Sequence, residues 1–369
     1  MSSALANGKT PYAIVVGLDT LNGIQTVRIL ARHKIPIIAI AKDPKHHGCR
    51  TRLCERIIFT NTATEELIQT LVALGPELKQ KAVLYPCVDM NMLLISRHRQ
   101  ALEPWYHVVL PAPEVIETLM NKLNFYTYAQ QNGFPIPQTR YLNSQEDANR
   151  AAAELTFPCV LKPPMSAIPE WEKNSKLKAY KLSSPAELLE FYERSKVWAK
   201  DLIVQEWVEG PDSNLYSCNC YFNDQFEPVV TFVSRKLRQW PPVTGESCLG
   251  EECRDDVVLN GRSPIAEAGG VELLYTMYCD TVGLPLPENL DQSYKGVKWV
   301  DLRRDVQSAL YHIQEGDLTL KGWWKSLQGK KAHALFAWND PAPFFGDLVR
   351  AARLYMVPEE RRHRDYRNL

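Results

Sequence analysis

Ile203-Val-Gln-Glu-Trp-Val-Glu-Gly210 is an apolar strand that runs directly into glutamates, and it follows a second such run, Pro158-Cys-Val-Leu-Lys-Pro163. Lys162 ends that earlier strand, and Lys122 begins a predicted helix upstream. A lysine at the end of a buried strand is costly unless its ammonium group meets an anion, and a nucleotide phosphate would supply one. Singly, each lysine is more often a surface residue. Together and in this order they predict a nucleotide site, in which the extended segment after residue 203 offers backbone N–H and C=O groups to an adenine edge.

Upstream of this stretch, apolar runs alternate with helical patterns. Continuous Val/Ile runs separated by helices are typical of a parallel, doubly wound sheet, so the first hundred residues predict an α/β domain. The expected strands are residues 12–17, 35–41, 81–86 and 107–110, and the expected helices are residues 23–33 and 64–74. The prolines at residues 111–113 predict a linker.

Gly17 and Gly23 flank the turn between the first strand and the first helix, as they would in a phosphate-binding loop. The spacing lacks the third glycine of the dinucleotide fingerprint, and no acidic residue ends the second strand to bind a ribose. A tight structural turn is therefore favoured over dinucleotide binding.

Downstream, residues 215–222 and 229–235 predict a hairpin with its turn at Asn223-Asp224. A basic, proline-rich stretch follows and contains Arg235, Lys236 and Arg238. Guanidinium groups can bind a phosphate or a carboxylate through two parallel hydrogen bonds, so this run is a candidate anion site. The alternative is a solvated basic turn. The last hundred residues predict one strand at 296–302, several helices and an aromatic-rich tail.

The composition excludes several classes of protein. Lys+Arg 43 balances Asp+Glu 43, so a broad nucleic-acid or anionic-membrane surface is not indicated. No apolar run approaches the ~20 residues of a membrane helix, and the first residues lack the apolar core of a signal peptide. The nine cysteines have no zinc-site spacing. We therefore expect a cytoplasmic protein with reduced thiols and no membrane span.

The order of these features resembles the ATP-grasp superfamily, and within it the carboxylate–amine ligases that include D-aspartate-ligase-like enzymes. The resemblance runs from about Ile14 to about Pro285. It rests on Lys122-Leu-Asn-Phe-Tyr126 with Gly133-Phe-Pro-Ile-Pro137, on the Lys162 strand, on Gln205-Glu-Trp-Val-Glu-Gly-Pro-Asp212, on Ser234-Arg-Lys-Leu-Arg-Gln-Trp-Pro-Pro242 with Cys248-Leu-Gly-Glu251, and on Gly261-Arg-Ser-Pro-Ile-Ala-Glu-Ala-Gly-Gly270.

This resemblance implies a fold that is α/β in its first part and α+β in its second. A pre-ATP-grasp, three-layer α/β domain would span residues 10–112. A two-lobed ATP-grasp domain, with the nucleotide between its lobes, would span residues 113–300, and a helical, aromatic extension would span residues 301–369.

The resemblance also implies a reaction and its residues. ATP would phosphorylate a carboxylate to an acyl phosphate, and an amine would attack it to form an amide. Lys122 and Lys162 would bind the phosphates; the adenine hinge would comprise Gln205, Glu206, Trp207 and Val208; Asp212 would bind the ribose. The catalytic cations would be Arg235, Lys236, Arg238 and Arg262, which would balance charge on the transferred phosphoryl group.

The sequence departs from the family where magnesium should bind. Family members carry a helix and two strands with a glutamate and a Glu-x-Asn motif, whereas here Asp256-Val-Val-Leu-Asn260 runs directly into Gly261. Asn260 is the one candidate remnant. Three alternatives remain open. The chain is an inactive variant that still binds nucleotide, the sequence is an erroneous version of a complete enzyme, or other acidic residues replace the missing magnesium ligands. The candidate substitutes are Glu251, Glu252, Asp255, Asp256 and Glu267.

The sequence therefore predicts an ATP-binding, ADP-forming carbon–nitrogen ligase with ATP as cofactor and Mg²⁺ implied. Its partners would be a small carboxylate and an amine, with no nucleic acid. A non-catalytic nucleotide-binding regulatory or scaffold protein is the first alternative, because the magnesium ligands are missing. An oxidoreductase that uses the first domain is the second, and the absent third glycine disfavours it.

Overall fold

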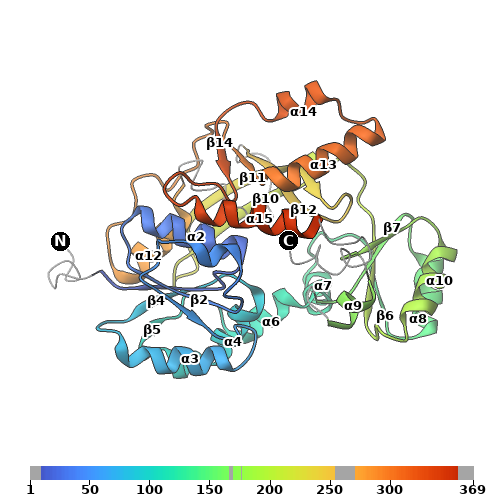
Figure 1. Ribbon diagram of the computed structural model, residues 1–369. Coiled ribbons are helices and arrows are strands. Elements are labelled where there is room, and N and C mark those ends of the chain that lie inside the picture. The colour runs from blue at the N-terminus through green and yellow to red at the C-terminus, as the bar shows by residue number, and fades with distance from the viewer. Residues whose placement is uncertain (1–9, 166–168, 176, 254–270, 356–369) are drawn as a thin grey trace. The chain divides into compact units, whose positions relative to one another are not determined.

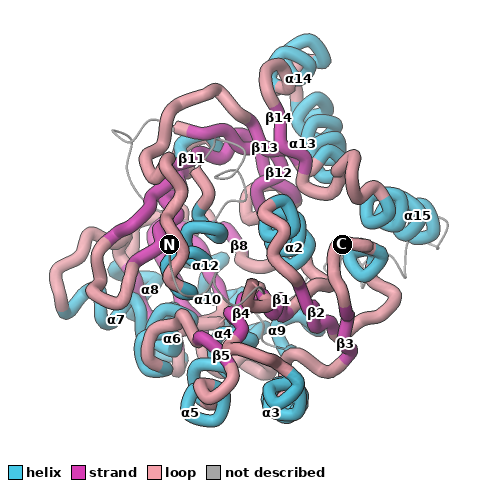
Figure 2. Tube along the Cα trace, turned by 90° about the vertical axis from the view of Figure 1, so that its left-hand side faces the viewer, coloured by secondary structure: helices cyan, strands magenta, loops and turns pink. Residues whose placement is uncertain are grey.

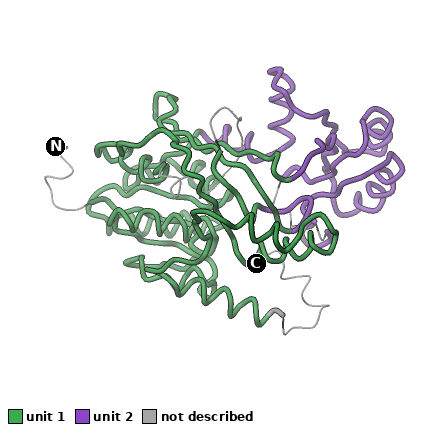
Figure 3. The backbone as a smooth tube through the Cα atoms, turned by 90° about the horizontal axis from the view of Figure 1, so that it is seen from above, with its two compact units in different colours: residues 1–111, 212–240, 247–369 green, residues 112–211, 241–246 purple. Residues whose placement is uncertain are grey.

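The computed structural model describes residues 10–165, 169–175, 177–253 and 271–355 (Figure 1). The chain divides into two compact units (Figure 3). Unit 1 comprises residues 1–111, 212–240 and 247–369, and unit 2 comprises residues 112–211 and 241–246. Among the described residues, no helix has both the length and the apolar character needed to cross a membrane.

The first sheet of unit 1 is parallel and has the strand order β3-β2-β1-β4-β5. Its strands are β1 (Ala13–Val16), β2 (Ile37–Ala41), β3 (Arg56–Phe59), β4 (Ala82–Pro86) and β5 (Tyr106–His107). Every residue of β1 and β2 is buried. Such runs form central strands because both faces of a parallel sheet are covered by helices.

Helices cover this sheet on both sides, as Figures 1 and 2 show. Val15 and Ala39 pack with α2 (Leu21–Arg32) and α12 (Leu273–Val282). Ile14 and Ile40 point the other way and pack with α3 (Glu66–Leu74) and α4 (Asp89–Arg97). The small helical elements of this region are α5 (Arg99–Leu102), η1 (His47–Arg50) and η2 (Gly75–Glu77). The predicted three-layer α/β architecture is confirmed.

A second, mixed sheet completes unit 1, with the order β10-β11-β12-β13-β14. Its strands are β10 (Tyr216–Phe222), β11 (Pro228–Trp240), β12 (Glu246–Glu252), β13 (Lys298–Val300) and β14 (Lys331–His333). The predicted hairpin is confirmed, because β10 and β11 pair antiparallel. The remaining elements of unit 1 are η3 (Asp212–Asn214), α13 (Leu302–Glu315), α14 (Leu320–Ser326) and α15 (Ala342–Tyr355).

The C-terminal elements of unit 1 are joined to its N-terminal layer by a buried ion pair. Arg28 Nε of α2 lies 3.1 Å from Asp340 Oδ2, and the two side chains are 3% and 2% exposed. Arg28 also donates to the carbonyl oxygens of Leu335 and Asp340, and Thr51 donates to Asp340. The division of the chain into three consecutive domains remains a prediction.

Unit 2 contains a four-stranded sheet with the order β6-β9-β7-β8. Its strands are β6 (Thr139–Leu142), β7 (Cys159–Lys162), β8 (Tyr180–Leu182) and β9 (Leu202–Glu206). Its helices are α6 (Pro113–Met120), α7 (Lys122–Gln131), α8 (Gln145–Glu154), α9 (Pro169–Asn174) and α10 (Pro185–Ser195). Apolar side chains of α8 and α10 pack on Leu161 and Val204 of this sheet.

The glycine loop of unit 1 has a steric explanation. Gly17 has a φ of +96°, and a Cβ atom added at Gly23 would lie 2.0 Å from the Gly17 carbonyl oxygen. Thr20 caps α2 by accepting a hydrogen bond from Gly23 N at 3.0 Å. The two glycines therefore allow the first strand and the first helix to approach closely.

We predict that Gly23→Ala destabilises the protein, because the new methyl group overlaps the Gly17 backbone. The free energy of unfolding in urea should fall by about 1–3 kcal/mol. Asn22→Ala is the matched control, because Asn22 is exposed on the same helix turn, and it should change stability by less than about 0.5 kcal/mol. Equal effects of the two variants would contradict the steric explanation.

Candidate functional site

Lys162 of unit 2 lies at the end of β7 and is hydrogen-bonded to two neighbours. Its Nζ donates to Gln205 Oε1 at 2.9 Å and to Tyr126 Oη at 3.0 Å. The ammonium group also lies 5.1 Å from the centre of the Tyr126 ring, within cation–π range. Gln205 comes from β9, which pairs with β7, and Tyr126 comes from α7. The structure thus brings together Lys162 and Gln205, two residues singled out in the sequence, and adds Tyr126.

A second pair of hydrogen bonds sets the orientation of the Gln205 amide. Thr139 stands opposite Gln205 in the β6–β9 pair, and its hydroxyl donates to the Pro137 carbonyl at 2.8 Å. Because the Thr139 proton is used in this way, the Thr139 hydroxyl oxygen accepts a hydrogen bond from Gln205 Nε2 at 2.8 Å. The other end of the amide, Gln205 Oε1, therefore points toward Lys162. We call Tyr126, Thr139, Lys162 and Gln205 the lysine clamp. An ammonium group has three donors and the clamp occupies two, so one remains for a ligand.

Lys122 begins α7 close to the chain segment that follows Lys162. Its backbone N–H donates to the Pro164 carbonyl at 2.8 Å, and Asn121 caps the helix by accepting from Leu123 N at 2.9 Å. Lys122 and Lys162 lie far apart in the sequence. This hydrogen bond joins the backbone at Lys122 to the segment that directly follows Lys162 in unit 2.

The hinge residues at the end of β9 and just beyond it divide into two groups. The backbone N–H groups of Glu206 and Trp207 donate to Gln138 O at 2.9 Å and Pro158 O at 3.0 Å, so these two donors are already used. Val208 is 72% exposed, and its backbone has no hydrogen-bond partner among the described residues. Of the backbone N–H groups of Glu206, Trp207 and Val208, only that of Val208 therefore lacks a partner among the described residues.

The hinge tryptophan also has a structural partner. Lys181 Nζ lies 4.7 Å from the centre of the Trp207 ring and 3.0 Å from Glu209 Oε1. These contacts hold the loop segment that follows β9 against β8 within unit 2.

Asp212 belongs to unit 1, where Gln239 connects it to a basic residue. Gln239 Nε2 donates to Asp212 Oδ1 at 2.7 Å, and Lys236 Nζ donates to Gln239 Oε1 at 3.0 Å. Burial raises the pKa of Asp212, although the nearby Lys236 charge works in the opposite direction. Gln239 lies in the stretch quoted for the resemblance, but the sequence assigned it no role, because that role depends on how β11 packs with η3.

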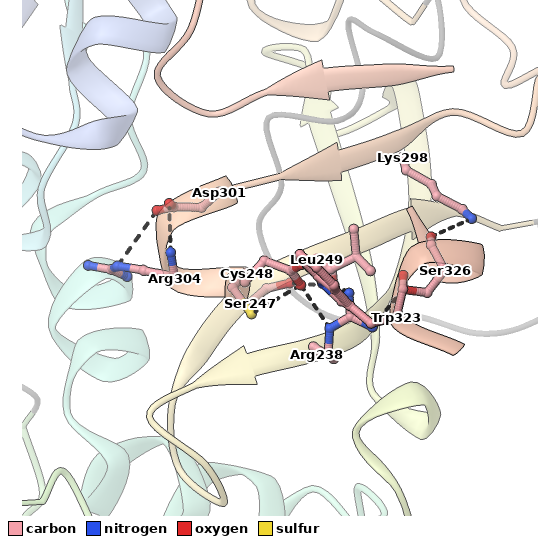
Figure 4. A network of polar contacts seen from close by, with 10 residues as sticks. Arg238, Ser247, Cys248, Leu249, Lys298, Asp301, Arg304, Trp323 and Ser326 are labelled. Atoms are coloured by element: carbon pink, nitrogen blue, oxygen red, sulfur yellow. Dashed lines mark hydrogen bonds and ion pairs between the residues drawn. The ribbon is translucent and has the colours of Figure 1, made fainter. Parts of the chain in front are cut away.

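The basic run lies within strand β11, and the alternative of a solvated turn is wrong for Arg238. Arg238 is only 7% exposed. Its Nε and Nη2 donate to the two carboxylate oxygens of Asp305, at 2.8 and 3.0 Å, and its Nη1 donates to Ser326 Oγ at 2.8 Å (Figure 4). Trp323 Nε1 donates to Asp305 at 2.9 Å. The prolines that suggest a turn come only after Trp240, so β11 continues through the arginines.

Arg235 is more accessible than Arg238 and pairs with a carboxylate of the neighbouring strand. Its side chain is 38% exposed, whereas that of Arg238 is 9% exposed, and its Nε donates to Glu251 Oε1 of β12 at 2.6 Å. Of these two arginines of β11, Arg235 therefore has the more accessible side chain.

Two candidate magnesium ligands, Glu251 and Glu252, lie among the described residues. The described residues contain no group of three or more His, Cys, Asp or Glu side chains that could hold a metal. Glu251 is paired with Arg235, and Glu252 is buried and accepts from the backbone N–H groups of Lys295 and Val297. The other candidates for this region lie outside the described residues: Asp255, Asp256, Asn260, Arg262 and Glu267.

No protein-family model matches the chain. Two kinds of curated relative do: a D-aspartate ligase of Enterococcus faecium, 27% identical over 188 residues, and a D-alanine–D-alanine ligase of Pseudomonas fluorescens, 29% identical over 111 residues. The first match covers 47% of this chain and 44% of the relative, and the second covers 30% and 31%. The chain therefore spans less than half the length of each of these relatives.

Solved structures match a larger share of the chain. N5-carboxyaminoimidazole synthetase from Staphylococcus aureus superimposes with a TM-score of 0.54 at 9% identity, covering 77% of this chain and 80% of that one. N5-carboxyaminoimidazole ribonucleotide synthetase from Thermus thermophilus gives 0.52 at 14% identity, with coverages of 76% and 81%. At such identities these matches establish the fold.

The chain has the ATP-grasp fold, and its predicted resemblance to that superfamily is confirmed. Its homologues are carboxylate–amine ligases, namely D-aspartate ligase and D-alanine–D-alanine ligases. The roles of the individual site residues remain predictions.

We predict that Thr139→Val loosens Lys162, because valine cannot accept the hydrogen bond from Gln205 Nε2. Lys162 should then react roughly tenfold faster with a lysine-acylating reagent, a factor expected when a hydrogen bond to a charged group is weakened. Peptide mass spectrometry would measure this rate. Thr139→Ser keeps the acceptor and should behave as the parent. Thr127→Val removes a different threonine hydroxyl of unit 2, bonded to Tyr141, and should leave the rate unchanged.

We further predict that Asp305→Asn destabilises unit 1, because it leaves the buried Arg238 charge uncompensated. The free energy of unfolding should fall by about 3–5 kcal/mol. Asp317→Asn is the control, since Asp317 is 61% exposed and pairs with His312. The double replacement Arg238→Met with Asp305→Leu should recover much of the loss. If Asp305→Asn is as mild as Asp317→Asn, the pair does not hold α13 in place.

Proposed function

We propose that this chain is an ATP-dependent, ADP-forming carboxylate–amine ligase. In such a reaction a carboxylate oxygen attacks the γ-phosphorus of ATP, and ADP leaves. The amine nitrogen then attacks the acyl carbon of the acyl phosphate, inorganic phosphate leaves, and the nitrogen loses a proton. The homology to D-aspartate and D-alanine–D-alanine ligases supports this class of reaction.

The observation that carries the proposal is the lysine clamp. Gln205 and Tyr126 fix the Lys162 ammonium group at the end of a strand, half-buried and with one donor left. A fixed, partly desolvated cation binds a phosphate oxygen more strongly than a mobile surface lysine, because little side-chain freedom is lost on binding. In this proposal Lys122 is the second phosphate-binding lysine.

The hinge and the basic strand complete the proposed assignments. Gln205, Glu206, Trp207 and Val208 form the adenine slot, with Val208 supplying the backbone contact, and Asp212 binds the ribose. Arg235 and Lys236 balance charge on the phosphates or on the substrate carboxylate. Arg238 supports them by holding β11 against α13. Arg262 is assigned to the same charge-balancing role on the resemblance alone.

One alternative function has its own support. The direct junction of Leu259-Asn260 with Gly261 lacks the chelating glutamates of the family. This departure of the sequence favours a non-catalytic nucleotide-binding protein, with a regulatory or scaffold role. Retention of nucleotide is ground-state binding and does not by itself lower a reaction barrier.

We predict that Lys162→Met weakens ADP binding by about 10- to 100-fold, because it removes a charge-assisted hydrogen bond to phosphate. Isothermal titration calorimetry would measure the change. Lys196→Met is the matched control, because Lys196 of unit 2 is exposed and pairs with Glu193 on the surface. Equal ADP affinity in Lys162→Met and the parent would show that Lys162 is structural.

A coupled ADP-release assay separates the two functions. ADP release that requires both a carboxylate and an amine would establish a ligase. Tight ADP binding without release, over a panel of amino-acid carboxylates and amines with added magnesium, would establish the non-catalytic alternative.

A further inference from the structure

A cavity of about 550 Å³ lies within unit 1, whereas the lysine clamp belongs to unit 2. The cavity walls come from the end of β13, from α13, from the segment after β14 and from α15. The volume is within the range of about 300–1,000 Å³ that is usual for small-molecule sites. The cavity is built from the aromatic C-terminal segment, which the proposed ligase function does not use.

The cavity wall is mostly apolar and partly aromatic. Val306, Leu310, Phe336, Phe344 and Leu348 are among the lining residues. Phe336 and Phe344 meet edge to face, with ring centres 5.3 Å apart and planes at 79°. A flat aromatic ligand could extend this packing, because rings prefer edge-to-face or offset contacts.

The charged groups at the wall are compensated within the protein. Arg303 Nε donates to Asp347 Oδ2 at 3.0 Å, and Asp347 is 2% exposed. Asp301 caps α13 by accepting from Arg304 N at 3.3 Å, as Figure 4 shows. Burial lowers the pKa of His333, with a further contribution from Lys331, and both effects disfavour a charged imidazole at the wall. A charged ligand would lose its hydration without gaining a counter-ion here.

Apolar side chains of the cavity remain exposed to solvent at its rim. Leu302, Leu310 and Leu348 are 45%, 55% and 42% exposed, although each lines the cavity. On α13 the opposite face is fixed, because Asp305, Ser308 and Ala309 are buried and Asp305 holds Arg238. The cavity is therefore a preformed apolar hollow on a rigid support, and a ligand that enters it would remove exposed leucine surface from water.

We infer that this cavity is a second ligand site, and that it takes a neutral, predominantly apolar small molecule with an aromatic ring. The aromatic wall, the internal compensation of charge and the exposed leucine rim define this class of ligand. The site stands independently of the proposed ligase function, because none of its lining residues is among those assigned to that function.

Two fluorescent probes test the chemical class. N-phenyl-1-naphthylamine is neutral, and 8-anilino-1-naphthalenesulfonate has the same rings with a sulfonate added. We expect one molecule of the neutral probe to bind per chain, and the anionic probe to bind at least about tenfold more weakly because its charge finds no partner. Equal affinities would overturn the assignment to neutral ligands.

Two tryptophan variants test the location. Val306→Trp adds bulk to the cavity from a half-buried position on α13 and should abolish binding of the neutral probe. Val349→Trp is the control, because Val349 is exposed on α15 and does not line the cavity. Circular dichroism would confirm that both variants fold. Undiminished probe binding by Val306→Trp would place the probe elsewhere and overturn the proposal.

A competition measurement tests whether the nucleotide occupies the cavity instead. ADP should not displace the neutral probe, and displacement would assign the cavity to the nucleotide.

Sedimentation of the parent and of Leu310→Asp tests whether a second copy of the chain occupies the cavity. A parent dimer that Leu310→Asp dissociates would give the cavity to a second copy, and it would overturn the small-molecule assignment. If the parent binds no ADP but retains the neutral probe, the ligase proposal fails and this one stands.

Discussion

The buried pair of Arg238 and Asp305 is the constraint on which the second half of unit 1 depends. Both side chains are nearly or fully removed from water, so each must have its opposite charge in place. Because Asp305 lies on α13 and Arg238 on β11, the pair fixes the helix against the sheet. Trp323 donates to Asp305 and Ser326 accepts from Arg238, so both residues attach α14 to the ion pair. One face of α13 is committed to this contact, and the other is left to line the apolar cavity.

The lysine clamp follows the same electrostatic rule with a different outcome. Arg238 has a full carboxylate partner, whereas Lys162 is held by neutral oxygens, from Gln205 and Tyr126. Neutral acceptors orient an ammonium group without cancelling its charge, so its attraction for an anion persists. The two cations are thus distinguished by the partners that the fold provides, and this difference separates a structural cation from a candidate ligand-binding one.

Much of the fold was predictable from the sequence, because the buried strands Ala13–Val16 and Ile37–Ala41 are continuous apolar runs. Strand β3 was missed because its Arg56–Phe59 pattern is that of a partly exposed edge. At the site, Lys162 and Gln205 were predictable from their positions at strand ends. Their partners Tyr126 and Thr139, and Asp305 for Arg238, were not, because tertiary contacts and strand register select them. For the basic run, the sequence offers a solvated turn as the alternative to an anion site because prolines lie just beyond it, whereas β11 continues to Trp240.

The Arg28–Asp340 contact bears on how the chain is made. These residues are 312 positions apart, and all of unit 2 is encoded between them. At ribosomal rates of roughly 5–20 residues per second, Arg28 waits about 15–60 s for its partner. During that interval α2 lacks the carboxylate that balances its buried guanidinium group. The chain of unit 2 is therefore synthesised in full before the N-terminal layer can be completed, because that layer gains its balancing carboxylate only when the C-terminal segment emerges.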